Sequence, residues 1–190
     1  MKIILASQSP RRIALLKSLN LPFDTIPSTL EESYDISDDP DIVVMSLAFE
    51  KAYEIAKEYP DAIVIAFDTI VYKNTILGKP KDEEDAYQML SLLNGSSHEV
   101  LTGMAIIHLS RRIKVTEVVR TTVTFRQVED DVLKRYIATK EPLDKAGAYG
   151  IQGFGALLID RIDGDYYAVM GLPLSTLDQF LNQYFKIQIL

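Results

Sequence analysis

Blocks of apolar residues alternate with polar stretches along the chain, and their spacing predicts strands and helices in alternation. The apolar run at 2–6 predicts a buried strand, and apolar residues at helical spacing predict a helix from about 10 to 19. Further helices are expected over 41–58, 82–93, 129–139 and 173–185. Further strands are expected at 22–27, 62–72, 75–77, 99–108, 114–125, 156–162 and 166–170. This order favours a mixed α/β (α+β) fold, an elongated mixed sheet flanked by helices with a central cleft.

Turn signals predict how the later strands are connected. The expected hairpin turns are Lys73-Asn74, Ser110-Arg111 and Asp163-Gly164. The strand at 62–72 is expected to be broken at Asp68-Thr69. The 190 residues suffice for one domain over 1–190, either undivided or in two lobes around the cleft.

Composition narrows the classes of function. Hydrophobic residues make up 47% of the chain and charged residues 25%, as is typical of soluble globular proteins. The net charge of −7 argues against a nucleic-acid partner or an anionic membrane surface. The absence of cysteine excludes disulfides and thiol nucleophiles, and two histidines exclude a His-rich metal site. The chain starts with a strand rather than a signal peptide, and no apolar run is long enough to span a bilayer, so we expect a cytoplasmic protein.

The segment from Ser7 to Arg12 combines hydroxyl groups, a helix start and two cations. Ser9 is a good N-cap and Pro10 suits the first helical position. Arg11 and Arg12 then fall in the first turn, where cations are unfavourable by about 0.3–1 kcal/mol unless an anion is present. The pattern predicts a phosphate site at this helix end. The alternative is an exposed basic turn with ordinary capping.

Two charged residues lie where the pattern predicts the core. Asp68 interrupts an apolar strand, and Lys51 lies within the apolar stripe of the helix 41–58. A buried carboxylate needs a partner, a hydrogen bond or a metal, so Asp68 is either catalytic or metal-binding, or it ends the strand and accepts from a nearby amide. Lys51 needs a partner or a ligand unless it snorkels to solvent. His98 is interpreted as structural.

Acidic and basic loop residues extend the candidate site. Glu31 and Glu32 are either solvated or, if Asp68 is close, ligands of a hard cation; oxygen ligands of this kind favour Mg²⁺ bound with water and a substrate phosphate. Lys79 and Lys81 form a turn that either contacts phosphate or is simply exposed.

The stretch 144–155 has four glycines in nine residues, from Gly147 to Gly155, with neither P-loop nor Rossmann spacing. Its glycines allow either close backbone approach or positive φ. Its one amide, Gln152, both donates and accepts, which suits a pyrimidine edge with a carbonyl beside an N–H.

These segments, in this order and over nearly the whole chain, resemble the Maf family of nucleoside triphosphate pyrophosphatases. The motifs that carry the resemblance are Ala6-Ser7-Gln8-Ser9-Pro10-Arg11-Arg12, Glu31-Glu32, Leu47-Ala48 with Lys51-Ala52, Asp68-Thr69, Gly78-Lys79-Pro80, Asn94-Gly95-Ser96-Ser97-His98 with Thr102-Gly103, Asp144 to Gly153, and Gly171-Leu172-Pro173-Leu174. The Ile151-Gln152-Gly153 form is similar to the branch that acts on dTTP and UTP, whereas the branch acting on 7-methyl-GTP usually carries glutamate in place of Gln152.

The resemblance implies an inosine-triphosphatase-like fold, often a homodimer, and hydrolysis between the α- and β-phosphates with a divalent cation, Mg²⁺ or Mn²⁺. It also implies a role in cleaning the nucleotide pool, including modified pyrimidine nucleotides. Its substrate-discriminating positions correspond to Arg11, Thr69 and Gln152.

Together with the residue chemistry, this gives a set of expected roles. The catalytic residues are Asp68 as general base, Lys51 and Glu32; the substrate-binding residues are Ser7, Arg11, Arg12, Thr69, Lys79 and Gln152, with Lys81 assisting; the metal ligands are Glu31, Glu32 and Asp68.

Two positions depart from the family pattern, and one alternative function stays open. Phe67 stands where a small residue commonly precedes the aspartate, which would narrow or reshape the site. Ala168 stands where many members carry asparagine, and it receives no role. The alternative to the enzyme is a nucleotide-binding regulator of septum formation without turnover, because the family is linked to inhibition of septation.

Overall fold

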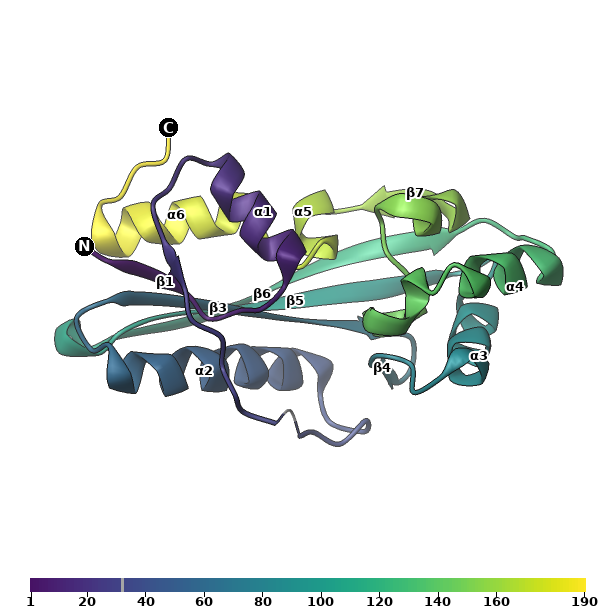
Figure 1. The fold of residues 1–190 in the computed structure, drawn as a ribbon, viewed down its shortest axis with the longest axis horizontal. Helices are drawn as coiled ribbons and strands as arrows, with labels where there is room; N and C mark the ends of the chain where they lie inside the picture. Colours follow the sequence, from purple (N-terminus) through teal and green to yellow (C-terminus); the bar gives the residue numbers. More distant parts are fainter. Residues whose placement is uncertain (32) are drawn as a thin grey trace.

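A mixed sheet runs the length of the molecule (Figure 1). The computed structural model describes residues 1–31 and 33–190. Its strands are β1 (Ile3–Leu5), β2 (Asp24–Thr25), β3 (Ile63–Tyr72), β4 (Ile76–Leu77), β5 (Ser97–His108), β6 (Ile113–Phe125) and β7 (Ile159–Asp163). Its α-helices are α1 (Pro10–Ser18), α2 (Pro40–Glu58), α3 (Glu83–Leu93), α4 (Asp130–Ala138), α5 (Tyr166–Val169) and α6 (Leu174–Phe185). Short 3₁₀ turns are η1 (Leu109–Arg111), η2 (Glu141–Asp144), η3 (Ala146–Ala148) and η4 (Gly153–Leu158).

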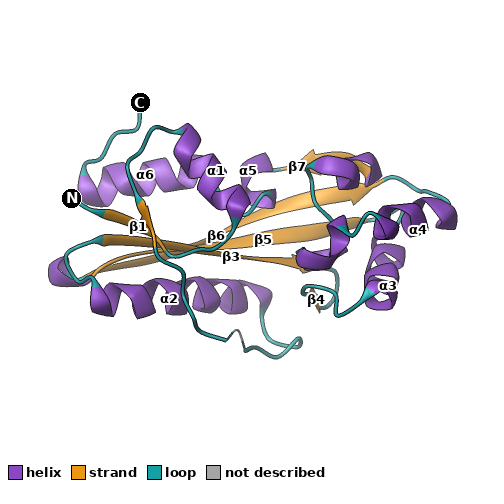
Figure 2. Cartoon of the chain, in the orientation of Figure 1, coloured by secondary structure: helices purple, strands orange, loops and turns teal. Residues whose placement is uncertain are grey.

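The sheet joins a parallel part to an antiparallel part in the order β2-β1-β3-β5-β6-β7, with β4 paired to β3. Strand β1 runs parallel to β2 and β3, whereas β3, β5, β6 and β7 pair antiparallel. Helices on both faces complete the mixed α/β fold expected from the sequence (Figure 2). None of the helices in the described part of the chain is long and apolar enough to cross a bilayer.

Alternation along β1 shows how the two faces are built. Ile3 and Leu5 pack in the cluster that contains residues of α1 and α6, whereas Ile4 packs with the alanines of α2. Successive strand side chains point to opposite faces, so one short apolar run serves two helical layers. At the other end of the sheet, α3 and α4 enclose a separate apolar cluster (Figure 1).

The structure corrects the prediction that β3 breaks at Asp68-Thr69. The antiparallel ladder to β5 continues through Asp68 opposite Gly103 and Thr69 opposite Thr102. The strand tolerates these polar residues because backbone pairing is independent of side-chain polarity and both side chains find polar partners.

The second correction concerns 166–170: Tyr166–Val169 form the short helix α5, and this stretch is not the second strand of a hairpin. The Asp165 side chain accepts from the Tyr167 N–H at 2.7 Å and so caps the short helix α5. Strand β7 pairs instead with the end of β6. The Asp163-Gly164 signal was therefore misread as a hairpin turn, because the capping Asp165 follows it directly.

Candidate functional site

A cleft of about 450 Å³ opens where the β1–α1 connection, β3 and the segment 144–152 meet. The predicted site residues that line it are Ser7, Arg11, Arg12, Lys51, Asp68, Thr69, Lys79 and Gln152. Glu31 and Lys81 are exposed and are not among the lining residues, and Glu32 lies outside the described residues. The structure thus gathers four of the predicted cations (Arg11, Arg12, Lys51 and Lys79), one buried carboxylate and the amide around one space.

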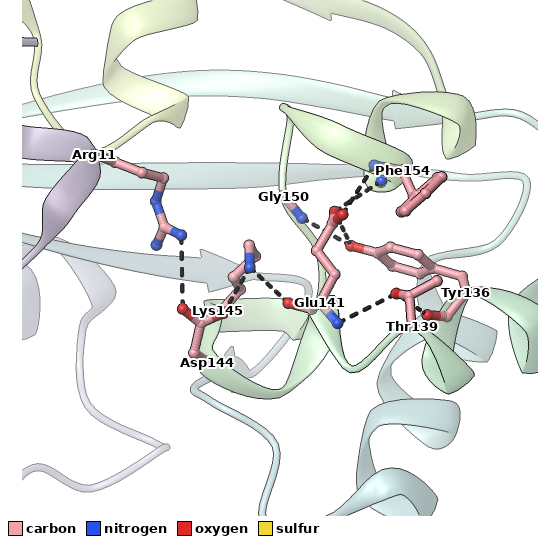
Figure 3. A network of polar contacts seen from close by, with 9 residues as sticks. Arg11, Tyr136, Thr139, Glu141, Asp144, Lys145, Gly150 and Phe154 are labelled. Atoms are coloured by element: carbon pink, nitrogen blue, oxygen red, sulfur yellow. Dashed lines mark hydrogen bonds and ion pairs between the residues drawn. The ribbon is translucent and has the colours of Figure 1, made fainter. Parts of the chain in front are cut away.

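The start of α1 is capped as the sequence predicts. The Arg12 N–H donates to Ser9 Oγ at 3.5 Å, Pro10 opens the helix, and the Ser9 N–H donates to Ser7 Oγ at 3.1 Å. Arg11, in the first turn, is partly exposed and lies 3.8 Å from the Asp144 carboxylate in an ion pair (Figure 3). Arg11 is therefore positioned at a helix N-terminus facing the cleft, where an anion would be stabilised.

Arg12 holds the backbone around the centre of the site. Its Nε donates to the Gly171 carbonyl at 2.7 Å, one terminal nitrogen donates to the Phe67 carbonyl at 2.8 Å, and the other donates to Thr69 Oγ1 at 3.0 Å. The expected phosphate role of Arg12 thus accompanies a structural role that sequence reasoning missed. Two of its acceptors among the described residues are backbone carbonyls, which no side-chain pattern reveals.

Asp68 and Lys51 form a buried ion pair in the cleft. Asp68 lies on the face of β3 that α2 covers, and α2 carries Lys51. The Lys51 and Asp68 side chains are 15% and 9% exposed, so Lys51 has a buried partner and does not snorkel to solvent. Asp68 meets the requirement that a carboxylate in a buried strand be paired.

Thr69 points to the opposite face of β3. Its hydroxyl accepts from Arg12 and lies 2.9 Å from Thr102 Oγ1, which donates in turn to the Ala168 carbonyl at 2.7 Å. Position 168, which received no role, therefore supplies a backbone acceptor to this chain of contacts. Phe67 is fully buried in the α1–α6 cluster and does not line the cleft, so its side chain does not narrow the site.

The far wall of the cleft is the segment 144–152. Lys145 donates from Nζ to the Glu141 carbonyl and to Asp144 Oδ1, both at 2.6 Å (Figure 3). Asp144, Lys145 and Tyr149 line the cleft, although the sequence placed none of them in the site. The Asp144-Lys145 pair within the family motif was the signal available for two of them.

The glycines of the stretch 144–155 serve both roles that the sequence allowed. Gly147 has a φ of +66° and Gly153 a φ of +72°, which favour glycine. At Gly155 a Cβ atom would lie 2.3 Å from the Gly150 carbonyl, so this glycine permits close backbone approach. The close contact is with the backbone of the same stretch.

His98, which is buried in the core, contacts Tyr149 of the far wall. Its Nε2 lies 2.7 Å from Tyr149 Oη, and the two rings pack edge to face. Burial, with a smaller contribution from the Lys73 charge, lowers the pKa of His98 to about 4. His98 is therefore neutral near neutral pH, in agreement with its structural interpretation.

Comparison with known proteins identifies the family. A family model described as Maf-like protein matches residues 2–184. The chain belongs to the Maf-like family.

Relatives from three bacteria, each named dTTP/UTP pyrophosphatase, align with this Maf-like chain over nearly its whole length. The protein of Bacillus cytotoxicus is 49% identical over 184 residues, which cover 96% of this chain and 95% of the relative. A Bacillus cereus protein is 50% identical over the same shares. The Alkaliphilus metalliredigens protein is 45% identical over 190 residues, covering 100% of this chain and 99% of the relative.

Two solved structures with low sequence identity overlap loosely with this chain. The Staphylococcus aureus Ham1 protein is 18% identical with a TM-score of 0.44, covering 84% of this chain and 80% of that one. A nucleoside-triphosphatase, or dITP/XTP pyrophosphatase, of Mycobacterium abscessus is 14% identical with a TM-score of 0.41, covering 67% and 76%. The fold described above rests on its own sheet topology and not on these overlaps.

The donors in the cleft limit how the Maf-like chain would hold a cation. Among residues 1–31 and 33–190, no three His, Asp or Glu side chains gather as a preformed metal cage. Asp68 offers carboxylate oxygen beside a space lined by Arg11 and Lys79. Mg²⁺ is commonly bound by one or two carboxylates together with substrate phosphates, so this donor set fits magnesium better than a metal that needs a full protein cage.

Proposed function

We propose that this chain hydrolyses dTTP and UTP between the α- and β-phosphates, releasing the nucleoside monophosphate and pyrophosphate. The substrate class comes from the relatives at 45–50% identity, which bear the name dTTP/UTP pyrophosphatase. The observation that supports the reaction class is the buried Asp68–Lys51 pair in a cleft also lined by Arg11 and Lys79. Phosphoryl transfer depends mainly on positioning and charge stabilisation, which such a site supplies.

Asp68 is the general base in this proposal. Water forms a new bond to phosphorus, the bridging P–O bond between the α- and β-phosphates breaks, and the proton lost by water passes to Asp68. Lys51 donates to Asp68 and so orients the carboxylate. Arg11 and Lys79 neutralise the charge of the triphosphate and of the leaving pyrophosphate. Ser7 and the backbone N–H of Arg11, in the first turn of α1, donate to phosphate oxygens.

A divalent cation completes the site, with Mg²⁺ favoured and Mn²⁺ the alternative. When bound, such an ion neutralises phosphate oxygens and lowers the pKa of a bound water. Asp68 is the described residue that would hold it, with Glu31 and Glu32 as the further ligands predicted from the sequence.

Gln152 reads the base in this proposal. Its side chain is exposed into the cleft, and among the described residues it has no hydrogen-bond partner. Uracil and thymine present a carbonyl beside an N–H, which the amide can match with one donor and one acceptor.

The first experiment incubates the purified protein with Mg²⁺ and, separately, dTTP, UTP, CTP, ATP, GTP and 7-methyl-GTP, and resolves the products. We expect monophosphate plus pyrophosphate from dTTP and UTP. Cleavage of 7-methyl-GTP alone would keep the reaction class and overturn the base assignment. Nucleotide binding without any product would favour a regulator of septum formation over an enzyme.

A further inference from the structure

The segment that carries Gln152 contains no α-helix or strand, yet its backbone is held on both sides of that residue. On one side, the Gly150 N–H donates to Tyr136 Oη at 3.2 Å. On the other, the N–H groups of Phe154 and Gly155 donate to the Glu141 carboxylate. The anchors therefore lie two positions before Gln152 and two and three positions after it.

Glu141 is the centre of these contacts (Figure 3). Its Oε2 accepts from the Phe154 N–H at 2.9 Å, and its Oε1 accepts from the Gly155 N–H and from the Tyr136 hydroxyl, both at 3.0 Å. The carboxylate thus caps the first N–H groups of η4, directly after Gln152. Hydrogen bonds to an ionised acceptor are about twice as strong as neutral ones.

Close packing leaves this arrangement little freedom. A Cβ atom on Gly153 would lie 2.5 Å from Glu141 Oε2, and one on Gly155 would lie 2.6 Å from Tyr136 Oη. Tyr136 is buried in the cluster formed by α3 and α4, so its hydroxyl is a fixed point. The backbone around Gln152 is therefore positioned by the apolar cluster that α3 and α4 form.

Glu141 also connects, through its backbone carbonyl, to the phosphate side of the cleft. The Glu141 carbonyl accepts from Lys145, Lys145 also donates to Asp144, and Asp144 pairs with Arg11 at the start of α1. Figure 3 shows this chain of contacts running from the η4 end of the segment to Arg11. The network thus joins the group proposed to read the base to a group proposed to bind phosphate.

We propose that Glu141, together with Tyr136, is a positioning residue that fixes the distance between Gln152 and the phosphate-binding groups and thereby selects pyrimidines over guanine. This role of Glu141 rests on the function proposed above. Guanine, like uracil, presents a carbonyl beside an N–H, so a glutamine amide matches both edges equally well. The two nucleotides differ in how far that edge lies from the phosphates, and only a fixed backbone converts that difference into selectivity.

The charge on Glu141 matters because three donors converge on it. In Glu141→Gln the carboxamide nitrogen would face at least one N–H or O–H donor, so a hydrogen bond is replaced by a donor–donor contact. Tyr136→Phe removes the hydroxyl that donates to Glu141 and accepts from Gly150, and it keeps the buried ring.

The test measures kcat and KM for UTP and GTP with Mg²⁺ in the wild type, Glu141→Gln, Tyr136→Phe and the double variant. We expect the ratio of kcat/KM for UTP over GTP to fall about tenfold in each single variant, as for the loss of one well-placed hydrogen bond. The double variant should fall by less than the product of the two, because both act on one network. Glu129→Gln is the matched control, since this exposed glutamate makes no capping hydrogen bond, and its ratio should be that of the wild type.

A merely structural role for Glu141 would lower kcat/KM for both nucleotides by the same factor, and an unchanged ratio in folded Glu141→Gln would overturn the proposal. If Glu141→Gln does not fold, Tyr136→Phe decides the question by the same ratio. If the wild type cleaves neither dTTP nor UTP, the proposed function fails, and the Kd values of UTP and GTP then test Glu141 separately. Equal shifts in both Kd values would overturn the positioning role, and loss of UTP preference would support it.

Discussion

The side chains on the two sides of the cleft are positioned by different kinds of structure. The phosphate side is built on a strand and two helices, with Asp68 and Thr69 on opposite faces of β3, held by Lys51 from α2 and by Arg12 from α1. The base side is a series of 3₁₀ turns, and Gln152 at its tip is exposed. Regular elements position the groups proposed to perform the chemistry, whereas a few polar contacts position the group proposed to choose the substrate.

This difference separates two kinds of sensitivity. On the phosphate side, a substitution should change the rate or the stability for every nucleotide, because the Asp68–Lys51 pair is buried and every nucleoside triphosphate carries the same phosphates. On the base side, a substitution of Gln152 should change the relative rates for different nucleotides with little loss of stability. The backbone there is held by Glu141 and Tyr136, and the Gln152 side chain is exposed.

Asp68→Asn should have the largest effect, a fall in kcat of about 10²–10⁴-fold, the usual contribution of a general base. The amide oxygen can still accept from Lys51, so the fold should survive. Steady-state rates with UTP and Mg²⁺, beside a thermal melt, measure both properties. Asp61→Asn, at an exposed position just before β3, is the control. Near-normal turnover in Asp68→Asn would remove Asp68 from the role of base.

His98 should make the stability of the base side depend on pH. Its pKa is lowered from 6.5 to about 4 in the folded protein by burial, so below pH 6.5 the unfolded chain binds a proton that the folded chain does not. Stability is therefore fully present above pH 6.5 and is lost as pH falls toward 4, by about 2 kcal/mol between roughly pH 7 and 5.

Urea unfolding of the wild type and His98→Gln at both pH values measures this loss. His98→Gln removes the titration and keeps a polar group near Tyr149, so its stability should change less between the two pH values. Equal pH dependence in the two proteins would show that His98 is not the group responsible.

Arg12→Lys tests whether neighbouring arginines have different roles. An ammonium cannot reach the Gly171 carbonyl, the Phe67 carbonyl and Thr69 Oγ1 together, so we expect a loss of about 2 kcal/mol of unfolding free energy. Arg11→Lys should change stability by less than about 0.5 kcal/mol, because Arg11 is partly exposed, but it should raise KM for UTP. Equal stability losses in the two variants would contradict this division.

Sequence reasoning predicted what depends on periodicity or on a local cap. The apolar blocks located the sheet and the long helices, and Ser9 and Pro10 located the start of α1. Asp68 was expected to need a partner, and for Lys51 a partner was one of two alternatives, the other being extension to solvent. These predictions succeed because the burial requirement of a charged side chain is visible in its neighbours along the chain.

What the sequence could not supply are contacts made to backbone atoms far away along the chain. Arg12 donates to the carbonyl of Gly171, which is 159 positions away. Glu141 accepts hydrogen bonds from the N–H groups of Phe154 and Gly155, which face it because Gly153 adopts a positive φ. The short helix at 166–169 was missed because a capping Asp165 resembles part of a turn. Such features depend on the assembled fold and leave no periodic signal.

Gln152→Glu should have the smallest effect on the stability of the fold and the clearest effect on which nucleotides are hydrolysed. A carboxylate offers only acceptors, so it would face the carbonyl of uracil or thymine with no donor, and we expect about a tenfold or greater fall in kcat/KM for dTTP and UTP. The side chain is exposed, so unfolding free energy should change by less than about 0.5 kcal/mol. Gln183→Glu, at an exposed position on α6, adds the same charge away from the cleft and should leave all rates unchanged. If relative rates across the nucleotides are the same in Gln152→Glu and the wild type, the base is read elsewhere, and the exposed tip of this segment then has no part in substrate choice.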